Sequence, residues 1–143
     1  MDIFETIKND HKTQREQGKE LLNTTDPEKR EKLFEQLKSL VDAHARSEER
    51  YFYIALLADD KSQGEARHSI SEHHEINEMM EEVDSKDISS DEWMESYKKF
   101  HELLIHHLDE EEEEIFSVAR EVLSPRQVDD LAKRYNEMMA DIH

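Results

Sequence analysis

Apolar residues recur every three or four positions along most of the chain, which is the spacing of one face of an α-helix. This periodicity predicts four long helices followed by a shorter fifth helix. We expect the helices at about residues 2–22, 27–57, 65–83, 90–122 and 125–141. Glycine and proline each occur only twice, which favours an all-α fold with short loops over a sandwich or barrel.

Polar capping residues mark the starts of two of these helices. Asp26 and Ser124 each stand directly before a proline, which is favoured at the first helical position. Ser124 and Gln127 also have the spacing of a capping box. We expect residues 2–122 to form an up-down-up-down four-helix bundle, with the fifth helix packed outside it. The 143 residues then form a single domain.

Two His-x-x-x-Glu motifs lie on the apolar stripe, and each has a lone histidine at nearly the same distance upstream. Residues four apart share one face of a helix, so each motif can direct an imidazole and a carboxylate at one point. The apolar residues around the two motifs also match, which indicates two related helical hairpins. The six candidate metal ligands are His11, His44, Glu48, His73, His107 and Glu111.

A solvated ion pair is the ordinary interpretation of a single His-x-x-x-Glu motif in so acidic a chain. This interpretation suits the two motifs poorly, because an unpaired imidazole or ionised glutamate is costly to bury on an apolar stripe. A metal ion supplies the missing partner, and imidazole with carboxylate suits iron, manganese or zinc. The pattern therefore favours a pair of metal ions with coordination positions left open for a small ligand.

The other five histidines are expected outside the site: His68, His74, His101, His106 and His143. His101 lies on a different helix face from the motifs and is expected to be partly buried. His74 with Glu78 is the replacement pair if His73 takes no part. Glu49 and Glu112 each follow a motif glutamate, and we expect solvent exposure rather than support of the ligands for both.

The overall composition excludes several classes of function. Acidic residues outnumber basic ones to give a net charge of −18, which repels nucleic acid and anionic membranes. There is no cysteine, so disulfides, thiolate metal sites and thiol catalysis are excluded. No signal sequence and no membrane-spanning run is evident, which predicts a cytoplasmic protein.

The sequence resembles the hemerythrin-like HHE cation-binding domains. The matching segments are Asp10-His11, His44 to Glu49, Glu72 to Ile76 and His107 to Phe116. The resemblance implies a four-helix bundle with a non-haem di-iron centre, in which Glu48 and Glu111 bridge two iron ions together with an oxo or hydroxo group. It also implies that the protein binds or processes dioxygen, peroxide or nitric oxide, or senses iron or oxygen.

Asn77 stands where hemerythrins proper carry a fifth histidine. One iron should therefore be less saturated, which favours a redox-active or sensory protein over an oxygen carrier or store. Catalase-like or other di-iron redox turnover is compatible with this, although no residue is singled out as its acid–base group. Two alternatives remain: a sensing module whose fold tightens on metal binding, and a metal-free acidic interaction bundle.

Overall fold

The computed structural model describes residues 1–142, and its regular secondary structure within that range is entirely helical. His143, which we expect outside the site, lies beyond the described residues. The α-helices are α1 (Ile3–Leu22), α2 (Pro27–Ser47), α3 (Ile54–Leu57), α4 (Gln63–Asp84), α5 (Asp91–Glu110), α6 (Phe116–Val122) and α7 (Pro125–Ile142). Two π-helical segments, η1 (Glu48–Tyr53) and η2 (Glu111–Ile115), join α2 to α3 and α5 to α6.

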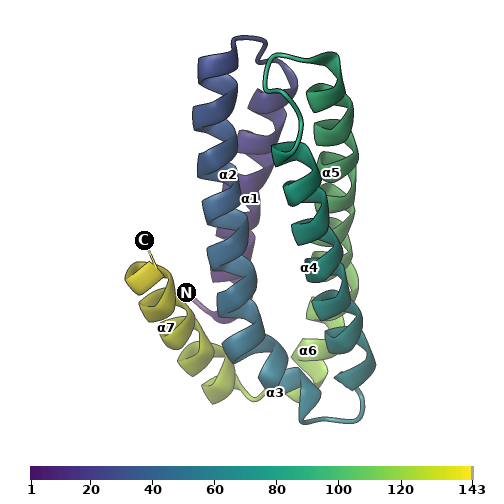
Figure 1. Cartoon of the computed structure of the whole chain (residues 1–143). Coiled ribbons are helices and arrows are strands. Elements are labelled where there is room, and N and C mark those ends of the chain that lie inside the picture. Colours follow the sequence, from purple (N-terminus) through teal and green to yellow (C-terminus); the bar gives the residue numbers. More distant parts are fainter. Residues whose placement is uncertain (143) are drawn as a thin grey trace.

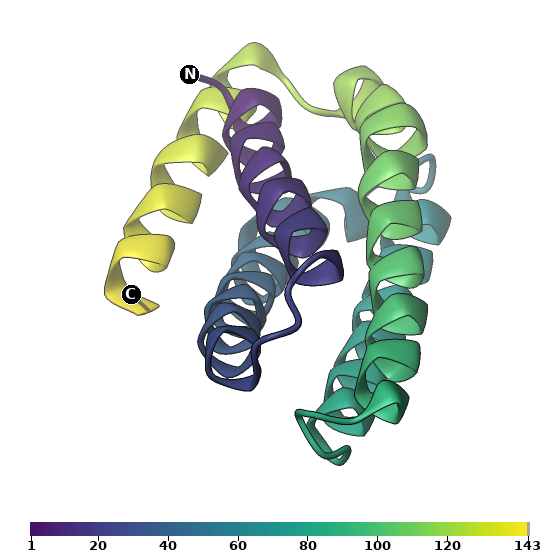
Figure 2. The same ribbon diagram turned by 90° about the horizontal axis from the view of Figure 1, so that it is seen from above.

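The four long helices α1, α2, α4 and α5 lie side by side, and the chain reverses direction from each to the next (Figure 1). Seen from above, α7 lies outside this group, against α1 and α2 (Figure 2). The predicted all-α fold is confirmed. Within residues 1–142, no helix combines the length and the apolar composition that a membrane span requires.

Both predicted helix caps are confirmed. The Asp26 side chain accepts a hydrogen bond from the backbone N–H of Lys29 at 3.1 Å. Ser124 and Gln127 exchange hydrogen bonds: the Gln127 N–H donates to the Ser124 hydroxyl oxygen at 3.2 Å, and the Ser124 N–H donates to the Gln127 side chain at 2.9 Å. These bonds satisfy N–H groups that have no partner inside their helices, so α2 and α7 begin where the sequence predicts.

The second and fourth predicted helices are not regular α-helices throughout. Each changes to a π-helix at its motif glutamate, Glu48 or Glu111. A π turn holds more residues than an α turn, so the buried face moves along the sequence beyond it. Leu56 is fully buried, whereas Ala55, which a continuous α-helix would place on the same face as His44, is only partly buried. The matched interruptions show that the two halves resemble each other beyond their histidines.

A layer of buried polar residues divides the apolar core into two clusters. On α1, Ile7 belongs to one cluster and Leu21 to the other, and the fully buried His11 lies between them. One cluster includes Phe4, Phe52, Leu56, Phe116 and Tyr135, and the other includes Phe34, Leu37, Trp93, Tyr97 and Phe100. Apolar packing therefore holds the helices together at both ends, and the polar layer is fixed between them.

Candidate metal centre

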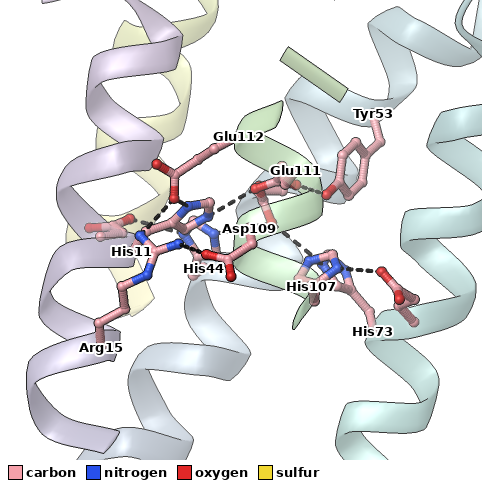
Figure 3. A network of polar contacts seen from close by, with 12 residues as sticks. His11, Arg15, His44, Tyr53, His73, His107, Asp109, Glu111 and Glu112 are labelled. Atoms are coloured by element: carbon pink, nitrogen blue, oxygen red, sulfur yellow. Dashed lines mark hydrogen bonds and ion pairs between the residues drawn. The ribbon is translucent and has the colours of Figure 1, made fainter. Parts of the chain in front are cut away.

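All six predicted ligands are buried in the polar layer between the two clusters. His11 comes from α1 and His73 from α4, while the two motifs span the α2–η1 and α5–η2 junctions. Figure 3 shows the labelled histidines and Glu111 converging from these helices. The structure therefore brings together residues that lie up to a hundred positions apart in the sequence.

The ligand atoms fall into two groups that share one glutamate. The first ligand group is His11, His44, Glu48 and Glu111, and the second ligand group is Glu48, His73 and His107. Within each group, the ligand atoms all lie within 4.8 Å of one another. Only Glu48 belongs to both groups, so a bridging role for Glu111 stays a prediction.

Four donor atoms of the first ligand group face one another without forming hydrogen bonds. His11 Nε2 lies 2.9 Å from Glu111 Oε1, and His44 Nε2 lies 3.1 Å from Glu48 Oε1. None of these four atoms has a hydrogen-bond partner among residues 1–142. Each buried polar atom left unsatisfied costs about 1–3 kcal/mol. A cation between them would accept all four lone pairs, so this donor set fits a metal ion.

A carboxylate contacts the Nδ1 atom of every predicted histidine ligand, on the side of the ring away from the other ligands. The Nδ1 atoms pair as follows: His11 with Glu112 at 2.9 Å, His44 with Asp10 at 3.2 Å, His73 with Glu49 at 2.9 Å, and His107 with Glu72 at 2.9 Å. A carboxylate on Nδ1 fixes the ring orientation and leaves the Nε2 lone pair for a metal ion. We call these four contacts the carboxylate ring.

The carboxylate ring follows the repeat of the chain. Asp10 and Glu72 each precede a ligand histidine, yet each binds the histidine of the following helix. Glu49 and Glu112 each follow a ligand glutamate and bind the histidine of the other half. The expectation that these last two glutamates serve mainly solvent is therefore wrong. Their matched position beside a motif glutamate is the signal that could have identified them.

Two tyrosines contact the centre and were not identified from the sequence. The Tyr53 hydroxyl donates to Glu111 Oε2. The Tyr135 hydroxyl, carried by α7, donates to Asp10 and also contacts His44 Nδ1. Burial and the nearby Asp10 charge raise the pKa of Tyr135 well above its usual value, so the hydroxyl stays protonated and can donate. Helix α7, the predicted fifth helix, thus covers one side of the centre.

The charges of the metal-free centre are divided unequally. Burial lowers the pKa of His11 to about 4, although Glu112 opposes this shift. Burial also disfavours charge on His44, but the Glu48 and Asp10 carboxylates together outweigh it and raise the pKa of His44 to about 9. Burial and the charge of Glu48 together raise the pKa of Glu111 well above its usual range. At neutral pH, His44 in the metal-free site therefore carries a proton, and Glu111 is shifted toward its neutral form.

The remaining sequence candidates lie apart from the ligand groups. His74 is exposed, so the His74–Glu78 replacement is not needed. Asn77 is also exposed and belongs to neither ligand group, but it lines a small cavity together with His44, His73 and His107. His101 is partly buried, as expected, and stacks on Tyr97.

A small cavity of about 10 Å³ adjoins three of the ligand histidines, His44, His73 and His107. A cavity of this size has room for about one water-sized molecule. Gln14 also lines it, and this side chain is 1% exposed. Its Nε2 donor has no hydrogen-bond partner within the described part of the chain. The position of Gln14 three residues after His11, on the same helix face, is the only sequence signal for it.

Comparisons with known proteins agree with this arrangement. Residues 2–119 match the family model of the hemerythrin HHE cation binding domain. A curated relative, a DNA nickase of Nostoc sp. strain PCC 7120, is 24% identical over 142 residues, which cover 99% of this chain and 40% of the relative. A crystal structure of a hemerythrin HHE cation binding domain-containing protein from Mycobacterium kansasii matches with a TM-score of 0.89. That match is 22% identical and covers 99% of this chain and 87% of the other, and it shows a shared fold.

Replacing Glu112 with Gln should weaken metal binding. The change removes the negative charge beside His11 Nδ1 and one of the two carboxylate partners of Arg15, whose Nη1 lies 2.7 Å from Glu112 Oε2. Loss of such a supporting contact typically costs about 10- to 100-fold in metal affinity. A competition titration against a chelator measures this. Glu113→Gln, an exposed neighbour, is the control, and equal affinities of the two variants would contradict the role of Glu112.

Metal binding should release protons, because a metal ion displaces the proton on His44. The pKa of His44 is raised to about 9, so protons compete with the metal below that pH and compete less as the pH rises. The apparent affinity for zinc should therefore increase with pH and level off above about 9. Titrations in a weakly buffered indicator solution measure both effects, and an affinity independent of pH would contradict this charge distribution.

Proposed function

The chain belongs to the hemerythrin HHE cation-binding domain family, and from this membership we propose that its two ligand groups hold two iron ions. We further propose that the centre lies in an up-down-up-down four-helix bundle and binds or reacts with dioxygen, peroxide or nitric oxide. The observation that carries the proposal is the shared Glu48 between a group of four ligands and a group of three, beside a cavity of about 10 Å³.

The difference between the two ligand groups has a structural cause. Tyr53 donates to Glu111 and so holds one oxygen of that glutamate away from the second ligand group. Phe116 occupies the matching position in the other half of the repeat and has no hydroxyl, so Glu48 remains free to serve both groups. The ion in the second ligand group would therefore have fewer protein ligands. We expect the small ligand to bind there.

The iron pair, when bound, supplies the redox chemistry toward oxygen species that none of these side chains provides alone. The protein's own contribution is to bind the ions, orient the ligand and limit access of water. Gln14 presents a buried amide donor at the cavity wall, which suits a ligand oxygen or nitrogen that accepts a hydrogen bond. Val41, Leu104 and Leu108 line the same cavity and favour a small, uncharged ligand.

A reactive centre is favoured over a reversible oxygen store. The fifth histidine of hemerythrins proper is replaced by Asn77, which is exposed and belongs to neither ligand group. A DNA substrate is disfavoured despite the name of the Nostoc relative, because the chain spans 40% of that protein and carries a net charge of −18.

The proposal is tested by comparing His107→Ala with the parent protein. Removing this imidazole leaves the second ligand group with two ligands, so iron content should fall by about half and the iron absorption spectrum should change. Metal analysis and ultraviolet–visible spectra of the oxidised and reduced proteins measure both. His74→Ala, at an exposed histidine, is the control. An unchanged spectrum and iron content in His107→Ala would contradict the proposal.

The same preparations test the ligand position through Gln14→Leu, which is similar in size and lacks the amide. This variant should retain its iron but bind nitric oxide more weakly, by about five- to tenfold for one lost hydrogen bond of about 1–1.5 kcal/mol. Unchanged affinity for nitric oxide in Gln14→Leu would exclude Gln14 as a ligand contact.

A further inference from the structure

Of the three further His-x-x-x-Glu pairs in the chain, two lie on helices that pack against each other. His68 and Glu72 are on α4, and His106 and Glu110 are on α5. His68 Nε2 lies 2.9 Å from Glu110 Oε1 and 3.6 Å from Glu72 Oε2. His106 Nε2 lies 3.0 Å from Glu110 Oε2 and 3.7 Å from Glu72 Oε2. The sequence alone gives neither histidine a role in metal binding, but the fold places both around the same two carboxylates.

The four side chains form a site that solvent can reach. The side chains of His68 and His106 are 54% and 63% exposed, whereas those of Glu72 and Glu110 are 8% and 17% exposed. The two carboxylates are therefore mostly buried, and the two imidazoles lie at the protein surface above them. A surface depression of about 240 Å³ beside them is lined by His68 and Glu110 and by two further carboxylates, Glu65 and Glu114. This concentration of negative charge attracts cations.

We propose that His68, Glu72, His106 and Glu110 form a surface binding site for a divalent transition-metal ion, separate from the buried centre. One ligand atom each from His68, Glu72 and Glu110 already lie within 4.8 Å of one another, and His106 adds a fourth ligand through its contact with Glu110. Two imidazoles and two carboxylates are a donor set that suits four-coordinate Zn²⁺ and also Fe²⁺.

Glu72 is held in place for this role. Its Oε1 accepts a hydrogen bond from His107 Nδ1 at 2.9 Å, which leaves Oε2 directed at the two surface histidines. A carboxylate that is already oriented loses little further freedom when it binds a cation. Glu72 therefore belongs to the carboxylate ring and to the surface site at once.

In the other half of the repeat, the matching carboxylate has a different partner. Asp10 is the counterpart of Glu72 in the carboxylate ring, but its Oδ2 atom, which contacts His44, also accepts from Tyr135 of α7. No hydroxyl from the described residues donates to Glu72, and its free oxygen faces His68 and His106 instead. Helix α7 covers Asp10, but no described helix covers Glu72 in the same way. The imidazoles of His68 and His106 lie next to Glu72 instead.

The test is to count zinc ions bound per chain at saturation, by equilibrium dialysis and metal analysis. The variants are His68→Gln/His106→Gln and a control, His74→Gln/His101→Gln, which removes two histidines outside both sites. The first variant should bind one zinc ion fewer than the parent protein, and the control should bind the same number. Because His68 and His106 are exposed, the double variant should keep the circular dichroism spectrum of the parent.

Equal zinc counts in the parent and His68→Gln/His106→Gln would overturn the proposal, as would an equal loss in the control. The parent and both double variants have the same buried ligands, so a difference in zinc count reports on the surface site. The comparison therefore gives its answer whether or not the centre holds iron, and a failure of the iron proposal would appear separately in His107→Ala.

Discussion

The carboxylate bound to Nδ1 of each buried histidine is the interaction on which the rest of the structure depends. Four imidazoles between two apolar clusters would be costly to bury without partners. The carboxylate ring supplies those partners from a different helix each time, so it also joins all four long helices around the centre. With the Nδ1 atoms occupied, the Nε2 atoms point inward, and the donor set of a metal centre results.

The carboxylate ring relates the two halves of the chain by an approximate twofold repeat. Where the halves differ, the proposed metal sites differ as well. Tyr53 restrains Glu111, while Phe116 leaves Glu48 free, so the two ligand groups differ in number of ligands. Tyr135 covers Asp10, while Glu72 faces the surface. The first difference gives one ion of the proposed pair an open position beside the cavity. The second leaves room for a further cation on the α4–α5 face.

Sequence periodicity predicted the helices and the burial of the six candidate ligands, because four-residue spacing on an apolar stripe determines which helix face a side chain occupies. The helix caps were predicted from polar residues that stand directly before proline. Periodicity could not predict the π-helical segments. It is read over several helical turns, and a single wider turn at Glu48 or Glu111 changes it too little to be recognised. It also missed Gln14, Tyr53 and Tyr135. Their roles depend on which residue of another helix lies opposite, and that is set by packing rather than by local pattern.

The most direct test of this account is a crystal structure of the iron-loaded protein with anomalous scattering measured at the iron edge. The account predicts two iron peaks in the buried layer, one against His11 and His44 and the other against His73 and His107, with Glu48 between them. A single buried peak, or iron bound only at the protein surface, would contradict it.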